Sequence, residues 1–480
     1  MRIGRLTEKA LMLALGRSAS VAAQFAVSLL LVRWWTADEF GRFQLVRVMV
    51  GVAALFDLGL PVGLLQATGG MTAERRQRIF RLGAAASVAV GLLVGMVLLA
   101  LAPVTADAAV RRALPFAALL VAATIPAGAL ESILVVRERH RAAGMVALVA
   151  AVGGLAASVL VLMVHPTLAA VYGALAFAAV ARLGALVPYA GLSLPRLRQP
   201  ALRTWMAEAW PLVRTSLVVS ANRFVGMASA QLDRVVVAAL FSAATLGHYA
   251  VGAWEVPFVA IFFSAIVSAI VPEMSEHWAA GRRDDFLAVW KEAVARAAWI
   301  VFPIWLWAWI WAPEILRVLF TSRYADALPV FRAYLLMLPL RVAVYSALLV
   351  AMGAMRALLV GALLDLALNA ALSVTLARLV GPVGPAAATA AATYIQVVYY
   401  LAYVRRRLAV PARRLLPWPA LGRALVVAAA ATLPTALLRS WRATDLVLLM
   451  LASAIAAAVV GLVMYVTAAG LFVGRAQHGR

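Results

Sequence analysis

Long apolar stretches recur along this chain from its first residues to its last, separated by short polar joints. One helix needs about 20 apolar residues to cross the hydrocarbon of a bilayer. Hydrophobic residues make up 65% of the chain and charged residues 13%, whereas a soluble domain is roughly one-quarter charged. The chain therefore lacks the polar residues to cover a soluble surface, and we predict an all-α integral membrane protein.

Fourteen membrane-spanning helices are predicted from these stretches. The first of them ends without a small-residue cleavage site, so we expect it to stay attached as a helix of the mature protein. The predicted helices cover residues 9–33, 43–67, 80–102, 113–136, 144–164, 168–190, 208–232, 245–271, 286–312, 328–351, 357–378, 384–404, 420–438 and 445–470.

Basic residues gather at alternate ends of the predicted helices. Twenty-five lie on the side of the N-terminus and ten on the opposite side, while eight arginines fall inside helices. Cytoplasmic loops of membrane proteins carry an excess of Lys and Arg. We therefore predict a multi-pass protein of the cytoplasmic membrane with both termini in the cytoplasm.

A weak internal repeat relates the two halves of the chain. Phe40-Gly41-Arg42-Phe43 matches Leu246-Gly247-His248-Tyr249 at an offset of 206, and the same offset carries Arg17 onto Arg223. At an offset of 207, Arg75-Arg76 falls on Arg282-Arg283. The repeat predicts two parallel six-helix lobes, at 1–192 and 193–410, followed by two further helices in 411–480. Transporters built from repeats bind substrate between them, near the membrane midplane.

Several kinds of chemistry are excluded by what the sequence lacks. There is no cysteine, the five histidines are scattered without metal-ligand spacing, and neither Lys9 nor Lys291 ends a phosphate-binding loop. We therefore expect no metal, no cofactor and no enzymatic activity.

Polar residues inside the predicted helices indicate an aqueous cavity, because a charge in the bilayer centre is costly and faces a cavity or a partner by default. On the first helix, polar residues fall on one face at helical spacing. Arg341 and Arg182 have an alternative role as buried partners of Asp365 or Glu131. The candidate cavity residues are Arg17, Gln24, Arg47, Asn222, Arg223, Arg341, Asn369 and Gln396.

The few intramembrane acids include two candidates for ion coupling, Glu255 and Asp365. Glu255 shares a helix face with His248 and Gly252 and precedes Pro257, which favours it as a proton or sodium site. The tryptophans near the outer helix ends, among them Trp35 and Trp311, are expected to anchor the protein at the membrane interface.

The order of several short motifs resembles the oligosaccharide flippases of the multidrug, oligosaccharidyl-lipid and polysaccharide exporter superfamily. The motifs are Trp35 through Phe43, Leu55 through Leu60, Leu232-Asp233-Arg234, Leu246 through Tyr249, Val271-Pro272-Glu273, Ile315-Leu316 and Phe320 through Ala327. The resemblance implies a two-lobed bundle that alternates between inward-open and outward-open forms. Its cavity arginines would be Arg17, Arg47 and Arg223, and its substrate an oligosaccharide on polyprenyl pyrophosphate, with a polysaccharide polymerase and glycosyltransferases as expected partners.

Within that superfamily, the predicted fourteen helices and the absence of an acid on the first helix differ from the drug exporters. The lipid II flippases also have fourteen helices, but their dense Arg- and Asp-rich start is not found here. The resemblance therefore favours the O-antigen or exopolysaccharide branch. Two other functions stay open. A drug/cation antiporter of the same superfamily should carry carboxylates rather than arginines in its cavity. A membrane glycosyltransferase would need acidic residues on sizeable outer loops, and the predicted outer loops are short.

Overall fold

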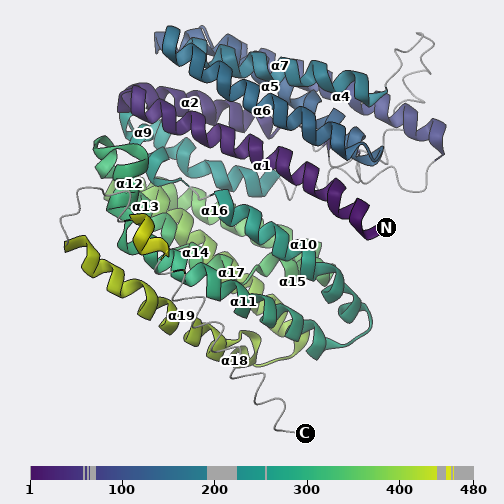
Figure 1. Cartoon of the computed structure of the whole chain (residues 1–480), viewed down its shortest axis with the longest axis vertical. Helices are drawn as coiled ribbons and strands as arrows, with labels where there is room; N and C mark the ends of the chain where they lie inside the picture. The colour runs from purple at the N-terminus through teal and green to yellow at the C-terminus, as the bar shows by residue number, and fades with distance from the viewer. Residues whose placement is uncertain are drawn as a thin grey trace. The chain divides into compact units, whose positions relative to one another are not determined.

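The computed structural model describes residues 2–57, 60–61, 64, 72–191, 224–254, 257–440, 450–455 and 458. Side chains are described for these residues apart from 2–15, 17, 257–262 and 438–440. This part of the chain is built of helices and contains no strand. The chain divides into two compact units, Met1–Gly247 and His248–Arg480, which the colours of Figure 1 allow the reader to follow. The predicted lobe boundaries at 192/193 and 410/411 stay predictions.

The first unit holds the purple and blue helices of Figure 1 and one helix that spans 224–240. The labelled helices of this unit are α1 (Arg2–Trp34), α2 (Ala37–Ala54), α4 (Ala73–Ala100), α5 (Ala108–Val136), α6 (His140–Val164) and α7 (Leu168–Ala190). Helix α9 (Ala243–Gly252) begins in the first unit and ends in the second.

The second unit contains long helices and several short ones. They are α10 (Pro257–Ala279), α11 (Arg283–Ile310), α12 (Ala312–Phe320), η1 (Ser322–Ala327), α13 (Leu328–Leu335), α14 (Leu338–Arg341), α15 (Tyr345–Ala351), α16 (Met355–Val380), α17 (Val383–Leu408), α18 (Ala412–Leu415), α19 (Trp418–Thr432) and η2 (Leu433–Ser440). A further helical segment covers 450–455.

Eight helices of the described residues are long and apolar enough to cross a membrane, or nine if one bent pair counts as a single span. The chain is therefore a multi-pass membrane protein, and the predicted all-α class is confirmed. The predicted count of fourteen stays a prediction. The eight are Ala73–Ala100, Ala108–Val136, His140–Val164, Leu168–Ala190, Arg283–Ile310, Met355–Val380, Val383–Leu408 and Trp418–Leu437.

Small residues set the packing of α4 against α5. Gly91 and Gly95 lie one turn apart and are buried. A Cβ on Gly91 would lie 2.8 Å from the Ala122 carbonyl oxygen, and one on Gly95 would lie 2.9 Å from that of Ala118. Lipid tails are as apolar as leucine, so membrane helices associate through close packing of this kind.

Two predicted helices end or break earlier than expected. The helix predicted at 43–67 is interrupted, because α2 stops at Ala54 and turns follow through Asp57, while residues 60, 61 and 64 are helical again. The helix predicted at 245–271 is divided, since α9 ends at Gly252 and α10 begins at Pro257. Proline lacks a backbone N–H and is tolerated in the first turn of a helix, which explains the restart at Pro257.

The single helix predicted at 328–351 is also wrong, because three short helices replace it with a bend of 40°. Pro339 lies in the first turn of α14, and Val344 has a left-handed φ of 40°. Backbone groups freed by a break must be satisfied within the protein when water is absent. The indole of the fully buried Trp290 does this for one of them, donating a 2.7 Å hydrogen bond to the Ala343 carbonyl oxygen.

An amphipathic helix, α12, lies where the sequence was expected to form an outer loop. Ile315, Leu316 and Phe320 are buried, whereas Glu314 and Arg317 lie between them on the other side of the helix. This helix has nine residues, two of them charged, and is too short to cross a membrane.

The two tryptophans expected to anchor at the membrane interface are buried instead. Trp35 is 3% exposed, and its indole donates to the Pro166 carbonyl oxygen at 3.2 Å. Trp311 is fully buried and donates to the Thr435 hydroxyl at 3.0 Å. The interfacial role predicted for these two residues is therefore wrong, because each indole N–H has a partner inside the protein.

An ion pair joins α5 to α7 inside the membrane-spanning part of the first unit. The Arg182 guanidinium donates to the Glu131 carboxylate, and both side chains are largely covered. This confirms the predicted alternative in which Arg182 is the partner of an intramembrane acid. Removing one member of such a pair leaves the other charge buried and uncompensated.

We expect Glu131→Ala to lower the free energy of unfolding by about 3–5 kcal/mol, because Arg182 then loses its counter-charge. The double variant Glu131→Ala, Arg182→Ala should recover much of this loss. Thermal unfolding of the purified protein in detergent measures both. Equal destabilisation by the single and double variants would contradict the ion pair's role.

Candidate functional site

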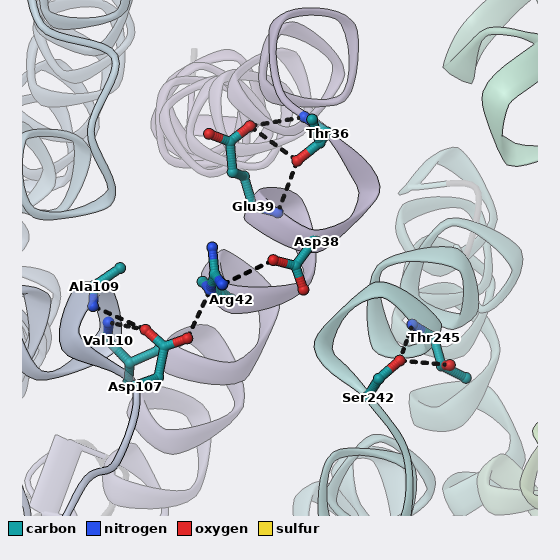
Figure 2. Close-up of polar contacts among 9 residues, drawn as sticks. All are labelled: Thr36, Asp38, Glu39, Arg42, Asp107, Ala109, Val110, Ser242 and Thr245. Carbon is teal, nitrogen blue, oxygen red and sulfur yellow. Dashed lines mark hydrogen bonds and ion pairs between the residues drawn. The ribbon is translucent and has the colours of Figure 1, made fainter.

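The motif from Trp35 to Phe43 starts α2 and fixes its first turn. The Thr36 hydroxyl accepts from the Glu39 amide at 3.2 Å, and the Glu39 carboxylate accepts from the Thr36 amide at 2.9 Å. This reciprocal pattern, a capping box, satisfies two backbone donors that a helix start leaves open (Figure 2). Phe40 and Phe43 are buried. The motif therefore serves the fold in this unit.

The start of α9 repeats this arrangement 206 residues later. Ser242 takes the place of Thr36, and its hydroxyl accepts from the Thr245 amide at 3.2 Å. Thr245, which matches Glu39, bonds back to the Ser242 hydroxyl at 3.0 Å (Figure 2). The two helix starts thus share the bond to the N-cap hydroxyl and a bond between the two side chains, while the bond to the N-cap amide is described at Thr36.

The same two helix starts touch each other through small residues. A Cβ on Gly41 would lie 1.7 Å from the Ala243 carbonyl oxygen, and a Cβ on Gly247 would lie 2.4 Å from that of Ala37. The offset of 206 carries Ala37 onto Ala243 and Gly41 onto Gly247. Each contact is therefore the repeat-related counterpart of the other, and we call these four residues the glycine crossing.

An ionic contact holds α2 to the start of α5 beside the glycine crossing. Arg42 donates to the Asp107 carboxylate at 2.7 Å and lies 2.8 Å from that of Asp38 (Figure 2). Burial raises the pKa of Asp107, but hydrogen bonds from the Val110 amide, from Arg42 and from the Ala109 amide outweigh it. The net effect lowers the pKa below its ordinary value, which keeps this carboxylate charged opposite Arg42.

The polar stripe predicted on the first helix is present in part. Ser28 donates to the Gln24 carbonyl oxygen of its own helix at 3.0 Å, and the Gln24 side chain is exposed. Arg47 of α2 reaches the same stripe, donating to the Ser28 hydroxyl at 3.4 Å. Arg17 lies in α1, but its side chain is outside the described residues.

The helix at 224–240 adds two polar residues beside Arg47. Gln231 approaches Gly51 on α2, with 3.6 Å between its Cδ and the position of a Cβ there. Arg234 donates to the Gln231 side chain at 3.5 Å, and its positive charge repels that of Arg47. The structure thus brings together Arg47, Ser28, Gln231 and Arg234, which we call the cationic cluster.

Three members of the cationic cluster, Ser28, Gln231 and Arg234, are not among the eight predicted cavity residues. The charge distribution places Arg234 with the ten basic residues predicted at the outer helix ends. Helical spacing carried the missing signal, because Arg234 shares a face with Arg223. Asn222 and Arg223 themselves lie outside the described residues.

The candidates of the second half lie between two packed helices. On α16, Asn369 and Ser373 are fully buried, and the Asn369 side-chain oxygen accepts from Ser373 at 2.8 Å and from Thr389 of α17 at 3.3 Å. Gln396 of α17 donates to the Gly361 carbonyl oxygen of α16 at 3.0 Å. Hydrogen bonds of this kind hold membrane helices together.

The remaining candidates occupy different places in the second unit. Arg341 ends the short helix α14 and is partly buried, and Asp365 is buried on α16. His248 packs against Tyr324, with ring centroids 5.2 Å apart and the ring planes tilted by 46°. Glu255, predicted to share the His248 face, lies outside the described residues.

The chain matches one protein family and a common membrane-protein fold. The model of a family described as polysaccharide biosynthesis protein matches residues 30–329. No curated protein matches the chain. Among solved structures, the lipid II flippase MurJ in an inward closed conformation matches with a TM-score of 0.70 and 11% identity, over 96% of this chain and 100% of that chain.

Two further structures belong to the MOP superfamily. An inward-facing multidrug resistance MATE family transporter has a TM-score of 0.61 and 13% identity, over 81% of this chain and 94% of that chain. A transporter from Pyrococcus furiosus, described by the reverse polarity of its binding pocket, has a TM-score of 0.53 and 13% identity, over 83% of this chain and 94% of that chain. At such identities the matches establish the fold.

We expect Gly41→Ala to lower the free energy of unfolding by about 1–3 kcal/mol, because the new methyl group would collide with a backbone carbonyl and not with a flexible side chain. Gly153→Ala in α6 is the matched control, since a Cβ there meets nothing within 4 Å. Thermal unfolding measures both. A Gly41→Ala protein as stable as the Gly153→Ala protein would show that the glycine crossing is not tight.

Proposed function

We propose that this chain, which belongs to the polysaccharide biosynthesis protein family, is a flippase for polyprenyl-pyrophosphate-linked oligosaccharide. It moves the lipid-linked sugar from the cytoplasmic to the outer leaflet of the cytoplasmic membrane for synthesis of a cell-surface polysaccharide. Both termini lie in the cytoplasm, as the distribution of basic residues favours. The match of the whole chain to the fold of MurJ supports a transporter that works by alternating access.

The proposal rests on the surroundings of the Arg47 side chain. This side chain is exposed in the structure, and among the described residues its hydrogen-bond partner is a neutral hydroxyl. It also lies in the field of a second arginine, Arg234. An arginine on a membrane helix with a like charge nearby and no carboxylate partner in the described chain suits a site for an anion.

A pyrophosphate is the anion that best matches this arrangement. It must cross the hydrocarbon with its negative charges offset, and guanidinium groups bind phosphate oxygens in a bidentate fork. Arg17 and Arg223, related by the repeat, would add one cation from each half. Gln24 and Asn222 stay proposed substrate contacts of the first unit. Arg341, Asn369 and Gln396 stay proposed substrate-site residues of the second unit, in which Asn369 and Gln396 hold α16 and α17 together.

The described carboxylates of the first unit argue against a cation antiporter. Glu131 is paired with Arg182, and Asp233 is buried with its carboxylate accepting from the Arg234 amide at 2.8 Å. Neither is arranged to exchange a bound cation for a proton. The cationic cluster, by contrast, would repel a cationic drug.

Loss of one cavity arginine should slow flipping by about ten- to a hundredfold, the worth of one hydrogen bond to a charged group. The variants are Arg17→Ala, Arg47→Ala and Arg223→Ala, and Lys at each position should restore activity only partly because it lacks the planar fork. Arg296→Ala is the matched control, since Arg296 lies on the exposed surface of α11 and pairs with Glu292.

The measurement is the transfer of a fluorescent polyprenyl-pyrophosphate oligosaccharide across proteoliposome membranes, read by quenching from outside. Incorporation into the vesicles must match the wild type. Unchanged transfer by the Arg17→Ala, Arg47→Ala, Arg223→Ala triple variant would refute the cationic cavity.

The coupling sites remain Glu255 and Asp365 in this proposal. We expect Glu255→Gln to abolish the dependence of flipping on a proton or sodium gradient, because the neutral amide cannot bind either ion by charge. Rates with and without an imposed gradient test this. If the gradient still accelerates flipping in the Glu255→Gln protein but not in Asp365→Asn, coupling belongs to Asp365.

A further inference from the structure

Seven arginines gather where four helices of the first unit begin or end. They lie in the first turns of α4 and in the turn between α5 and α6, and two glutamates accompany them. The arginines are Arg75, Arg76, Arg78, Arg81, Arg137, Arg139 and Arg141, and the glutamates are Glu74 and Glu138. We call this group the arginine patch.

Direct contacts join the arginine patch across these helices. Arg137 donates to the side chain of Gln77 on α4, and its guanidinium lies 5.4 Å from the centroid of the Phe80 ring. Gln77 in turn donates to the Gly191 carbonyl oxygen at the end of α7, at 3.1 Å. Arg139 donates to the Tyr189 carbonyl oxygen of α7 at 2.8 Å. The patch is therefore one surface with a fixed shape.

Arg137 and Arg139 contact neutral groups: an amide side chain, a carbonyl oxygen and an aromatic ring. None of these contacts neutralises the positive charge of either guanidinium. Burial lowers the pKa of the Arg137 guanidinium, and the charges of Arg139 and Arg76 lower it further. Like charges held this close repel one another, and a bound anion would relieve the repulsion.

The repeat shows that membrane orientation alone does not require such a patch. At an offset of 207, Arg75-Arg76 becomes Arg282-Arg283, but Gln77 and Arg78 become Asp284 and Asp285. Arg282 lies 3.5 Å from the Asp285 carboxylate, and Arg283 stacks on Trp278 at 3.4 Å from the ring centroid. The turn between α5 and α6, with Arg137, Arg139 and Arg141, corresponds by helix order to the turn between α15 and α16, where residues 352–356 carry a single arginine, Arg356. Acidic residues contribute little to topology, so both turns can orient their helices while only the first keeps its excess charge.

A lipid-facing stripe begins one turn from the arginine patch. On α6, Met145, Val149 and Val152 are exposed by 60%, 68% and 60%, and they follow the exposed Arg141 at helical spacing. Exposed apolar side chains on a spanning helix face the acyl chains, so Arg141 and its neighbours lie at the depth of the lipid headgroups.

We propose that the arginine patch binds the headgroup phosphates of anionic phospholipids in the leaflet at this end of the first unit. The acyl chains of the bound lipid would lie along the exposed stripe of α6. Basic pockets at the ends of membrane helices are suited to such headgroups. This site is separate from the cationic cluster, and it does not depend on what the protein transports.

Native mass spectrometry of the full chain, titrated with phosphatidylglycerol or zwitterionic phosphatidylcholine, tests this proposal. One arginine near an anionic surface is worth about a fivefold change in affinity, so Arg137→Gln, Arg139→Gln should weaken phosphatidylglycerol binding by at least about tenfold. Phosphatidylcholine binding should stay unchanged. The matched control is Arg282→Gln, Arg283→Gln, which should alter phosphatidylglycerol binding less than about twofold.

A second double variant controls for misfolding of the first, because Arg137 also supports the contact between α4 and α7 and its loss could disturb the fold. Arg75→Gln, Arg76→Gln removes the repeat-equivalent pair, whose side chains make no hydrogen bond or ion pair within the described part of the chain, and should weaken binding similarly. Equal loss in this pair and in the Arg282, Arg283 control would overturn the proposal. Displacement of phosphatidylglycerol by inorganic phosphate at equal concentration would also overturn it, since the site would then bind soluble phosphate.

Discussion

The glycine crossing constrains the rest of the first unit. Two helix starts approach so closely at Gly41 and Gly247 that no side chain fits between backbone and backbone. The capping residues and Arg42 then fix how α2 leaves this point, which decides where Arg47 lies one turn and a half later. A motif that marks the family thus acts by positioning, and the polar residues proposed to meet substrate follow from it.

The cost of charge in a bilayer explains how the other polar groups are arranged. Glu131 and Arg182 neutralise each other, serines donate to carbonyl oxygens of their own helices, and Asn369 is closed in by hydroxyl groups. Each arrangement satisfies a group that hydrocarbon would leave without a partner. Against this background an exposed Arg47 beside a second cation stands apart, and the contrast is what gives it functional weight.

Hydrophobic length and charge asymmetry were enough to predict an all-α membrane protein and, within a few residues, the spans α5, α6, α7, α16 and α17. They could not place the breaks at 253–254 and 342–344, because hydropathy averages over the proline and the left-handed valine beside them. The pairing of Arg182 with Glu131 was one of two predicted alternatives. Helical spacing puts Arg234 on the polar face of its helix with Arg223, but its proximity to Arg47 depends on how two helices cross, which spacing along the sequence does not report.

The reciprocity of the glycine crossing has an evolutionary reading. Gly41 contacts Ala243, and Gly247 contacts Ala37. Each of the two helix starts therefore contributes the same pair of repeat-related positions to the contact. This is the geometry of an isologous interface between identical subunits. If the chain arose by duplication, this reciprocal contact would descend from the two-fold interface of an ancestral homodimer whose two subunits are now fused in one chain. Substitutions at these positions should then be inherited in pairs, each small residue changing only together with its counterpart across the former dimer axis.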